Sequence, residues 1–125
     1  MFQVLLVALG GAVGSVFRFL VGEATLRLVG HGFPWGTLIV NIVGSFLIGV
    51  FAELIVIKFD GSVQVRLFLI TGILGGFTTF SAFSLETAAL MENGSGLSAL
   101  GYLALSVGFS LAAVFAGLAL MRALV

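Results

Sequence analysis

Residues 75–84 contain side chains that could contact an anion. They also contain two glycines at which a helix could be broken. The stretch begins with two adjacent glycines, Gly75 and Gly76. Three phenylalanines at a spacing of three follow, interleaved with four hydroxyl residues: Phe77, Phe80 and Phe83, with Thr78, Thr79, Ser81 and Ser84. Residues three apart are neighbours on a helix, so the rings would share a face. Because the edge of a phenyl ring is electropositive, this face could contact an anion.

The same stretch lies inside an apolar segment that begins near Val65. Hydroxyl groups at membrane depth must find partners, and a double glycine weakens a helix there. One interpretation is a transmembrane helix broken near Gly75 that carries an aromatic and hydroxyl track. If two subunits met at the break, the carbonyls of Gly75 and Thr78 could surround a hard cation. The alternative is a glycine packing notch followed by lipid-facing phenylalanines.

The composition is that of an integral membrane protein. Of the 125 residues, 61% are hydrophobic and only 8% are charged, whereas about a quarter of a soluble domain is charged. The net charge of zero gives no basic surface for nucleic acid. The absence of cysteine excludes disulfides and thiolate metal sites, and a single histidine argues against a histidine metal site.

The apolar runs predict an all-α protein with four transmembrane helices in one domain, at about residues 2–29, 35–57, 63–91 and 97–124. Turn residues separate them, as in Gly30-His31-Gly32-Phe33-Pro34. No Lys or Arg precedes the first run, which is longer than the apolar core of a signal peptide. We therefore expect the first run to be retained as a span.

Two further polar stripes recur at intervals of four residues. They are Thr37, Asn41 and Ser45 in the second span, and Tyr102, Ser106 and Ser110 in the fourth. Amide and hydroxyl donors without a fixed positive charge suit the passage of a small anion. Alternatively, Asn41 could bond another helix as structural glue, and the serines could bond the carbonyls of their own helix.

Two ionisable residues lie within or near the ends of spans, where such groups indicate function. Arg18 could raise the anion concentration at a pore mouth, and Glu86 could gate or order the outer end of the track. Alternatively, Arg18 extends to the interface or joins a structural ion pair, and Glu86 is a solvated group at a helix end.

The basic residues set the orientation only weakly. An even number of spans places both termini on one side with Lys58, Arg66 and Arg122, and leaves Arg27 on the other side. Such a chain could insert both ways, which would permit an antiparallel dimer.

Taken together, these motifs resemble the Fluc (CrcB) family of fluoride channels along essentially the whole chain. The matching residues run from Gly11-x-x-Gly14-x-x-x-Arg18 through Phe33-Pro34-x-Gly36-Thr37-Leu38-x-x-Asn41-x-x-Gly44-Ser45 to Gly72-x-x-Gly75-Gly76-Phe77-Thr78-Thr79-Phe80-Ser81-x-Phe83-Ser84-x-Glu86, followed by the Tyr102, Ser106 and Ser110 spacing. The resemblance implies a dual-topology homodimer of antiparallel subunits in the inner (plasma) membrane of a prokaryote. It further implies two pores per dimer for passive fluoride export.

The resemblance also implies roles for individual residues. The carbonyls of Gly75 and Thr78 would bind a structural sodium ion at the dimer centre, and Phe80, Phe83 and Asn41 would contact fluoride. Thr37, Ser81, Tyr102, Ser106 and Ser110 would extend the polar track, with Arg18 and Glu86 towards the mouths. One residue departs from the family pattern: Ala82 stands where threonine is usual, so the track lacks a hydroxyl and we expect slower conduction.

Two other functions remain open from the sequence. A small dual-topology multidrug exporter would need a membrane-embedded carboxylate near the middle of the first span, where the chain offers only Glu23, well past that point. A non-transporting membrane scaffold would tolerate loss of Asn41 or Phe80. No feature of the sequence indicates an enzyme.

Overall fold

The structure, a computed structural model, describes all residues from Met1 to Val125 and is entirely helical. Four helical segments are long and apolar enough to cross a membrane: Phe2–Val29, Trp35–Lys58, Val63–Glu92 and Gly96–Leu124. The shortest has 24 residues, and at 1.5 Å per residue this gives about 36 Å, more than the roughly 30 Å of a bilayer core. The expectation of an all-α protein with four such helices is confirmed.

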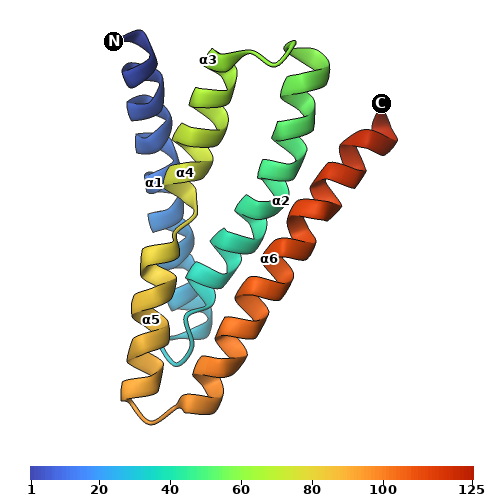
Figure 1. Ribbon diagram of the computed structural model, residues 1–125. Helices are drawn as coiled ribbons and strands as arrows, with labels where there is room; N and C mark the ends of the chain where they lie inside the picture. Colours follow the sequence, from blue (N-terminus) through green and yellow to red (C-terminus); the bar gives the residue numbers. More distant parts are fainter.

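Three of these segments are single helices, namely α1 (Phe2–Val29), α2 (Trp35–Lys58) and α6 (Gly96–Leu124). The third is composite. It consists of α3 (Val63–Arg66), the π-helix η1 (Leu67–Leu74), α4 (Gly75–Phe77) and α5 (Phe80–Glu92). The two termini lie towards the same end of the molecule (Figure 1).

Close approach between helices depends on glycine at two crossings. Where α1 meets η1 and α4, a Cβ on Gly10 would lie 2.6 Å from the Phe68 carbonyl oxygen, and one on Gly76 would lie 2.6 Å from that of Gly11. Where α2 meets α6, a Cβ on Gly49 or Gly117 would come within 3.2 Å of the other's Cα. These distances are too short for a side chain, so the crossings require glycine.

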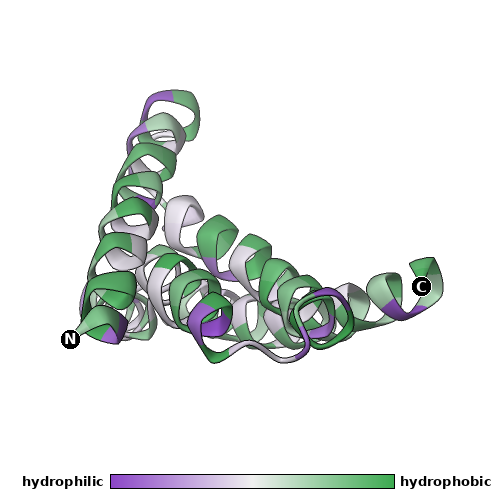
Figure 2. Ribbon diagram, turned by 90° about the horizontal axis from the view of Figure 1, so that it is seen from above, coloured by the Kyte–Doolittle hydropathy of each residue, from purple (hydrophilic) through white to green (hydrophobic).

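Most large apolar side chains lie on the outside of the helices. Only 14 of the 125 residues are buried, and hydrophobic colouring dominates the helices in Figure 2. An apolar surface of this extent suits lipid or other membrane helices rather than water. The single salt bridge joins Arg122 to Glu53 at 2.8 Å, between the C-terminal parts of α6 and α2.

Extended backbone at Thr78 and Thr79 separates α4 from α5, and we refer to these two residues as the interruption of the third span. Thr78 has φ −89° and ψ 161°, and Thr79 has φ −154° and ψ 122°. The glycines that led us to expect the interruption near Gly75 are themselves helical, with φ −62° and ψ −37° at Gly75. The chain leaves the helix later because Thr79 acts as the N-cap of α5, its Oγ1 accepting a hydrogen bond from the Ala82 amide at 3.1 Å.

Candidate functional site

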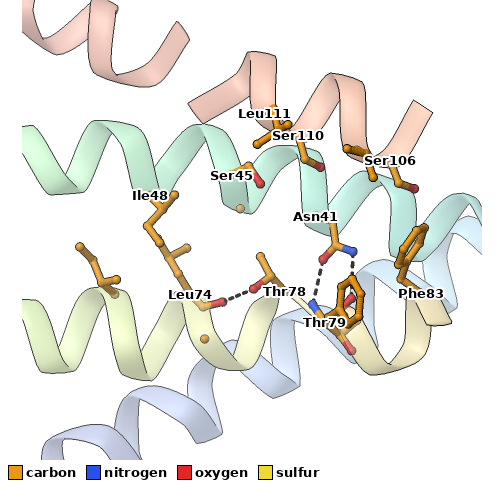
Figure 3. Close-up of a pocket in the computed structure, with 15 residues that line it drawn as sticks. Asn41, Ser45, Ile48, Leu74, Thr78, Thr79, Phe83, Ser106, Ser110 and Leu111 are labelled. Atoms are coloured by element: carbon orange, nitrogen blue, oxygen red, sulfur yellow. Dashed lines mark hydrogen bonds between the residues drawn. The ribbon is translucent and has the colours of Figure 1, made fainter. Parts of the chain in front are cut away.

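A cavity of about 400 Å³ lies between α2, α6 and the middle of the third span. Figure 3 shows how its polar side chains converge from these three segments. They are Asn41 and Ser45 from α2, Thr78 and Thr79 from the interruption, and Ser106 and Ser110 from α6. Phe80 and Phe83 contribute aromatic walls. We refer to this space as the first cavity.

The first cavity is polar but carries no charge, since none of its 15 lining residues is Asp, Glu, Lys, Arg or His. Hydrogen-bond donors can replace the water around a small ion. A fixed opposite charge would hold the ion in place, whereas a neutral wall lets it leave again. The lining therefore suits transit of an ion better than tight storage.

Two serine hydroxyls facing this cavity have no partner within the chain. The Oγ atoms of Ser106 and Ser110 are both buried and accept or donate no hydrogen bond, and Ser106 is only 5% exposed. A buried hydroxyl without a partner lowers stability by roughly 1–3 kcal/mol. Neither serine bonds its own helix, so both are available to a ligand.

Asn41 is bound to the backbone of the interruption through both of its polar atoms. Its Nδ2 donates to the Thr79 carbonyl at 2.9 Å, and its Oδ1 accepts from the Thr79 amide at 2.8 Å. Figure 3 shows the two bonds side by side. Because a side-chain amide carries two N–H groups, one remains for another acceptor. Asn41 thus has the cross-helix bonding considered from the sequence and keeps a donor beside the first cavity.

The two phenylalanines of the site have different surroundings. Phe83 is buried, and its ring centroid lies 5.6 Å from that of Phe80 and 5.2 Å from that of Tyr102. Phe80 is 77% exposed. The ring of Phe80 is therefore not enclosed by the rest of the chain.

Arg18 and Thr37 face a second cavity of about 230 Å³, together with Glu23, Thr79 and Ala82. Ala82 does not line the first cavity. If position 82 carried the hydroxyl that the resemblance led us to expect, it would therefore lie on the Arg18 side of the third span. Within the chain, the Nε of Arg18 donates to the Gly76 carbonyl at 3.0 Å.

Tyr102 packs against Phe83, which lines the first cavity, and bonds Glu86. It is fully buried, and its hydroxyl donates to Glu86 Oε1 at 3.1 Å. Glu86 and Thr37 both line a third cavity of about 110 Å³. Tyr102 itself is not among the residues lining the first cavity. Ser81 also lies apart from it, exposed, with its Oγ 3.3 Å from Thr79 Oγ1.

The backbone carbonyls proposed for a cation are released from their usual donors. In a continuous helix the Thr79 amide would donate to the Gly75 carbonyl, but it donates to Asn41. Likewise the Ala82 amide would donate to Thr78, but it donates to Thr79 Oγ1. Gly75 and Thr78 both line the first cavity. Since carbonyl oxygen is a ligand for hard cations, these residues fit such an ion.

Thr79 is the main residue that the sequence did not single out. It caps α5, pairs with Asn41 and borders both cavities. Threonine followed by helix-forming residues is a known N-cap pattern, so capping preference could have identified it.

Comparison with known proteins gives consistent matches along the chain. The family model described as CrcB-like protein, Camphor Resistance (CrcB), matches residues 5–118. A protein of Rhizobium etli named fluoride-specific ion channel FluC is 65% identical over 125 residues, covering 100% of both chains. Proteins of the same name from Rhizobium johnstonii and Mesorhizobium japonicum are 64% and 52% identical, each over 99% of both chains.

Proposed function

The chain belongs to the CrcB family, and from this membership we propose that it is a passive fluoride-specific ion channel. The resemblance seen in the sequence is thereby confirmed. A channel of this kind is not an enzyme, because no bond of the ion is made or broken. The multidrug exporter is not favoured, since the relatives are named as fluoride channels and the first cavity contains no carboxylate.

Within the structure, the observation that best supports the proposal is the pair of buried, unpartnered hydroxyls of Ser106 and Ser110. They face Asn41 and the rings of Phe80 and Phe83 across the first cavity. Fluoride is the smallest halide and a strong hydrogen-bond acceptor, so two free hydroxyls and one amide N–H are suitable replacements for its water.

Conduction would follow from this wall of donors. The hydroxyls and the spare N–H of Asn41 donate to the ion, and the ring edges of Phe80 and Phe83 add weak electrostatic attraction. Thr37, Ser81, Tyr102 and Glu86 would continue the path away from the first cavity. No positive side chain lines the first cavity to trap the ion.

A second copy of the chain would complete the pore. Phe80 is exposed in the single protomer, and large apolar side chains cover the outer helix faces. The weak charge bias between the two ends allows an antiparallel arrangement, with two pores per dimer and the third span broken at mid-membrane. In such a dimer the carbonyls of Gly75 and Thr78 from both copies would hold a sodium ion that fixes the two interruptions together.

The four apolar helices and bacterial relatives identify a multi-pass membrane protein of a prokaryote. We propose that the protein lies in the inner membrane. A fluoride path there would allow the anion that forms inside the cell from its neutral acid to leave down its gradient.

Fluoride release from liposomes tests the proposal, with sodium present throughout. The purified protein should release fluoride, and the Ser106→Ala/Ser110→Ala double variant should release it about 30-fold more slowly, since two net hydrogen bonds are lost at about 1 kcal/mol each. Ser95→Ala in the loop before α6 serves as the matched control. A double variant as fast as the parent would exclude this cavity as the path.

A further inference from the structure

We propose that Arg18 is a positioning residue that holds the interruption of the third span in its extended form through its hydrogen bond to the Gly76 carbonyl. The inference rests on the proposed function for its consequence, but its structural part can be tested without any transport. It gives Arg18 a role different from attracting anions to a pore mouth.

Side chains from two neighbouring helices form hydrogen bonds to the backbone at and beside the interruption. On one side, Arg18 of α1 donates from Nε to the Gly76 carbonyl at 3.0 Å. On the other side, Asn41 of α2 pairs with both backbone atoms of Thr79. The two extended residues, Thr78 and Thr79, lie within or next to the segment bounded by these contacts.

Arg18 donates to the Gly76 carbonyl in place of the backbone amide that would do so in a continuous helix. In a continuous helix the amide of Phe80 would bond the Gly76 carbonyl, but α4 ends at Phe77 and α5 begins at Phe80, and no such bond forms between them. A carbonyl left bare in a low-dielectric interior favours rejoining of the helix. The guanidinium satisfies this carbonyl and so stabilises the extended form.

Helix α1 packs closely against α4 at this point. A Cβ on Gly76 would lie 2.6 Å from the Gly11 carbonyl oxygen and 3.1 Å from the Ser15 amide. Arg18 is half-buried and forms no salt bridge, although Glu23 lines the same second cavity. Its other N–H groups remain available to that cavity, while Nε is committed to the backbone.

Three substitutions separate the hydrogen bond from the charge. In Arg18→Gln the side-chain nitrogen occupies the same place along the chain as Nε, so the donor is kept and the charge is lost. Arg18→Met has similar length but neither donor nor charge. Arg18→Lys keeps the charge but moves its nitrogen one atom further out. Arg27→Met, at an exposed position near the end of the same helix, is the control.

The measurement is amide hydrogen exchange of the segment 77–83 in detergent or nanodiscs, with fluoride efflux recorded in parallel. Arg18→Met should accelerate exchange about tenfold or more, because one charge-assisted hydrogen bond is lost. Arg18→Gln should stay within about threefold of the parent. Fluoride efflux should fall in the same order, and Arg27→Met should change neither quantity.

Equal exchange in the Gln and Met variants would overturn the proposal. So would a Lys variant that behaves as the parent while Gln and Met are both equally impaired, because that pattern requires only the charge. If the parent released no fluoride, the proposed function would fail, but the exchange series would still decide the role of Arg18.

Discussion

Replacing Asn41 by leucine removes both hydrogen bonds to Thr79 while keeping nearly the same side-chain shape. The two bonds, at 2.9 and 2.8 Å, satisfy the carbonyl and the amide of an extended residue. After the substitution, both backbone groups lie against an apolar side chain, and the first cavity also loses its amide donor.

The size of the effect follows from the number of groups left without partners. A buried backbone group without a partner lowers stability by about 1–3 kcal/mol, and because the two Thr79 groups are part-buried we take the lower end, roughly 2 kcal/mol for the pair. At about 1.4 kcal/mol per factor of ten, this value disfavours the native form of the interruption roughly 30-fold. We therefore expect fluoride efflux to fall by at least about 30-fold.

The assay is fluoride efflux from liposomes at matched protein content, with amide exchange at Thr79 as a second readout. Asn93→Leu is the control, because Asn93 lies exposed in the turn after α5. Faster exchange at Thr79 together with slow efflux would show that Asn41 positions the backbone. An Asn41→Leu variant that conducts within about threefold of the parent would refute this reasoning.

Three further substitutions give sharp expectations. Ala82→Thr adds a hydroxyl to the second cavity, and because one hydrogen bond contributes about 1 kcal/mol, fluoride efflux should rise about fivefold. Unchanged efflux would mean that the second cavity lies off the path. Phe80→Leu should slow efflux about tenfold through loss of the ring edge, without lowering the unfolding temperature of the single chain, because Phe80 is 77% exposed there. Phe115→Leu, at a position on α6 that is 68% exposed and outside the first cavity, should leave efflux intact. Gly14→Ala places a Cβ against the Ile73 carbonyl and 2.8 Å from the Phe77 amide, so thermal unfolding should report a loss of about 1–3 kcal/mol, whereas Gly101→Ala, which meets nothing within 4 Å, should be neutral.

The four long helical segments could be predicted because their signals are local. Uninterrupted apolar runs define the spans, and residues such as Gly30 and Pro34 mark where the chain must turn. The polar stripe of Ser106 and Ser110 also follows from helical spacing alone, and both side chains face the first cavity.

The position of the extended residues was harder to predict. Glycine disfavours helix in isolation, so Gly75 was the natural place to expect the change. Close packing against α1 keeps Gly76 helical, the chain leaves the helix at Thr78 directly after Phe77, and the N-cap at Thr79 starts the next helix. The π-helix from Leu67 to Leu74 left no signal in the sequence that we can identify.

Contacts between distant residues could not be derived from spacing. The bond from Arg18 to Gly76 joins residues 58 apart, and those from Asn41 to Thr79 join residues 38 apart. Residue type narrowed the possible roles of Arg18 and Asn41. Only the packing of α1 and α2 on the third span shows which backbone groups their side chains bond.

The most direct test of the central claim is the reversal potential of currents through the purified protein in a planar bilayer, with fluoride on one side and chloride on the other. We predict a potential close to the limit for fluoride alone, because the first cavity offers small-anion hydrogen-bond donors and no fixed charge. A reversal potential near zero, or currents carried by cations, would contradict the assignment of a fluoride-selective path.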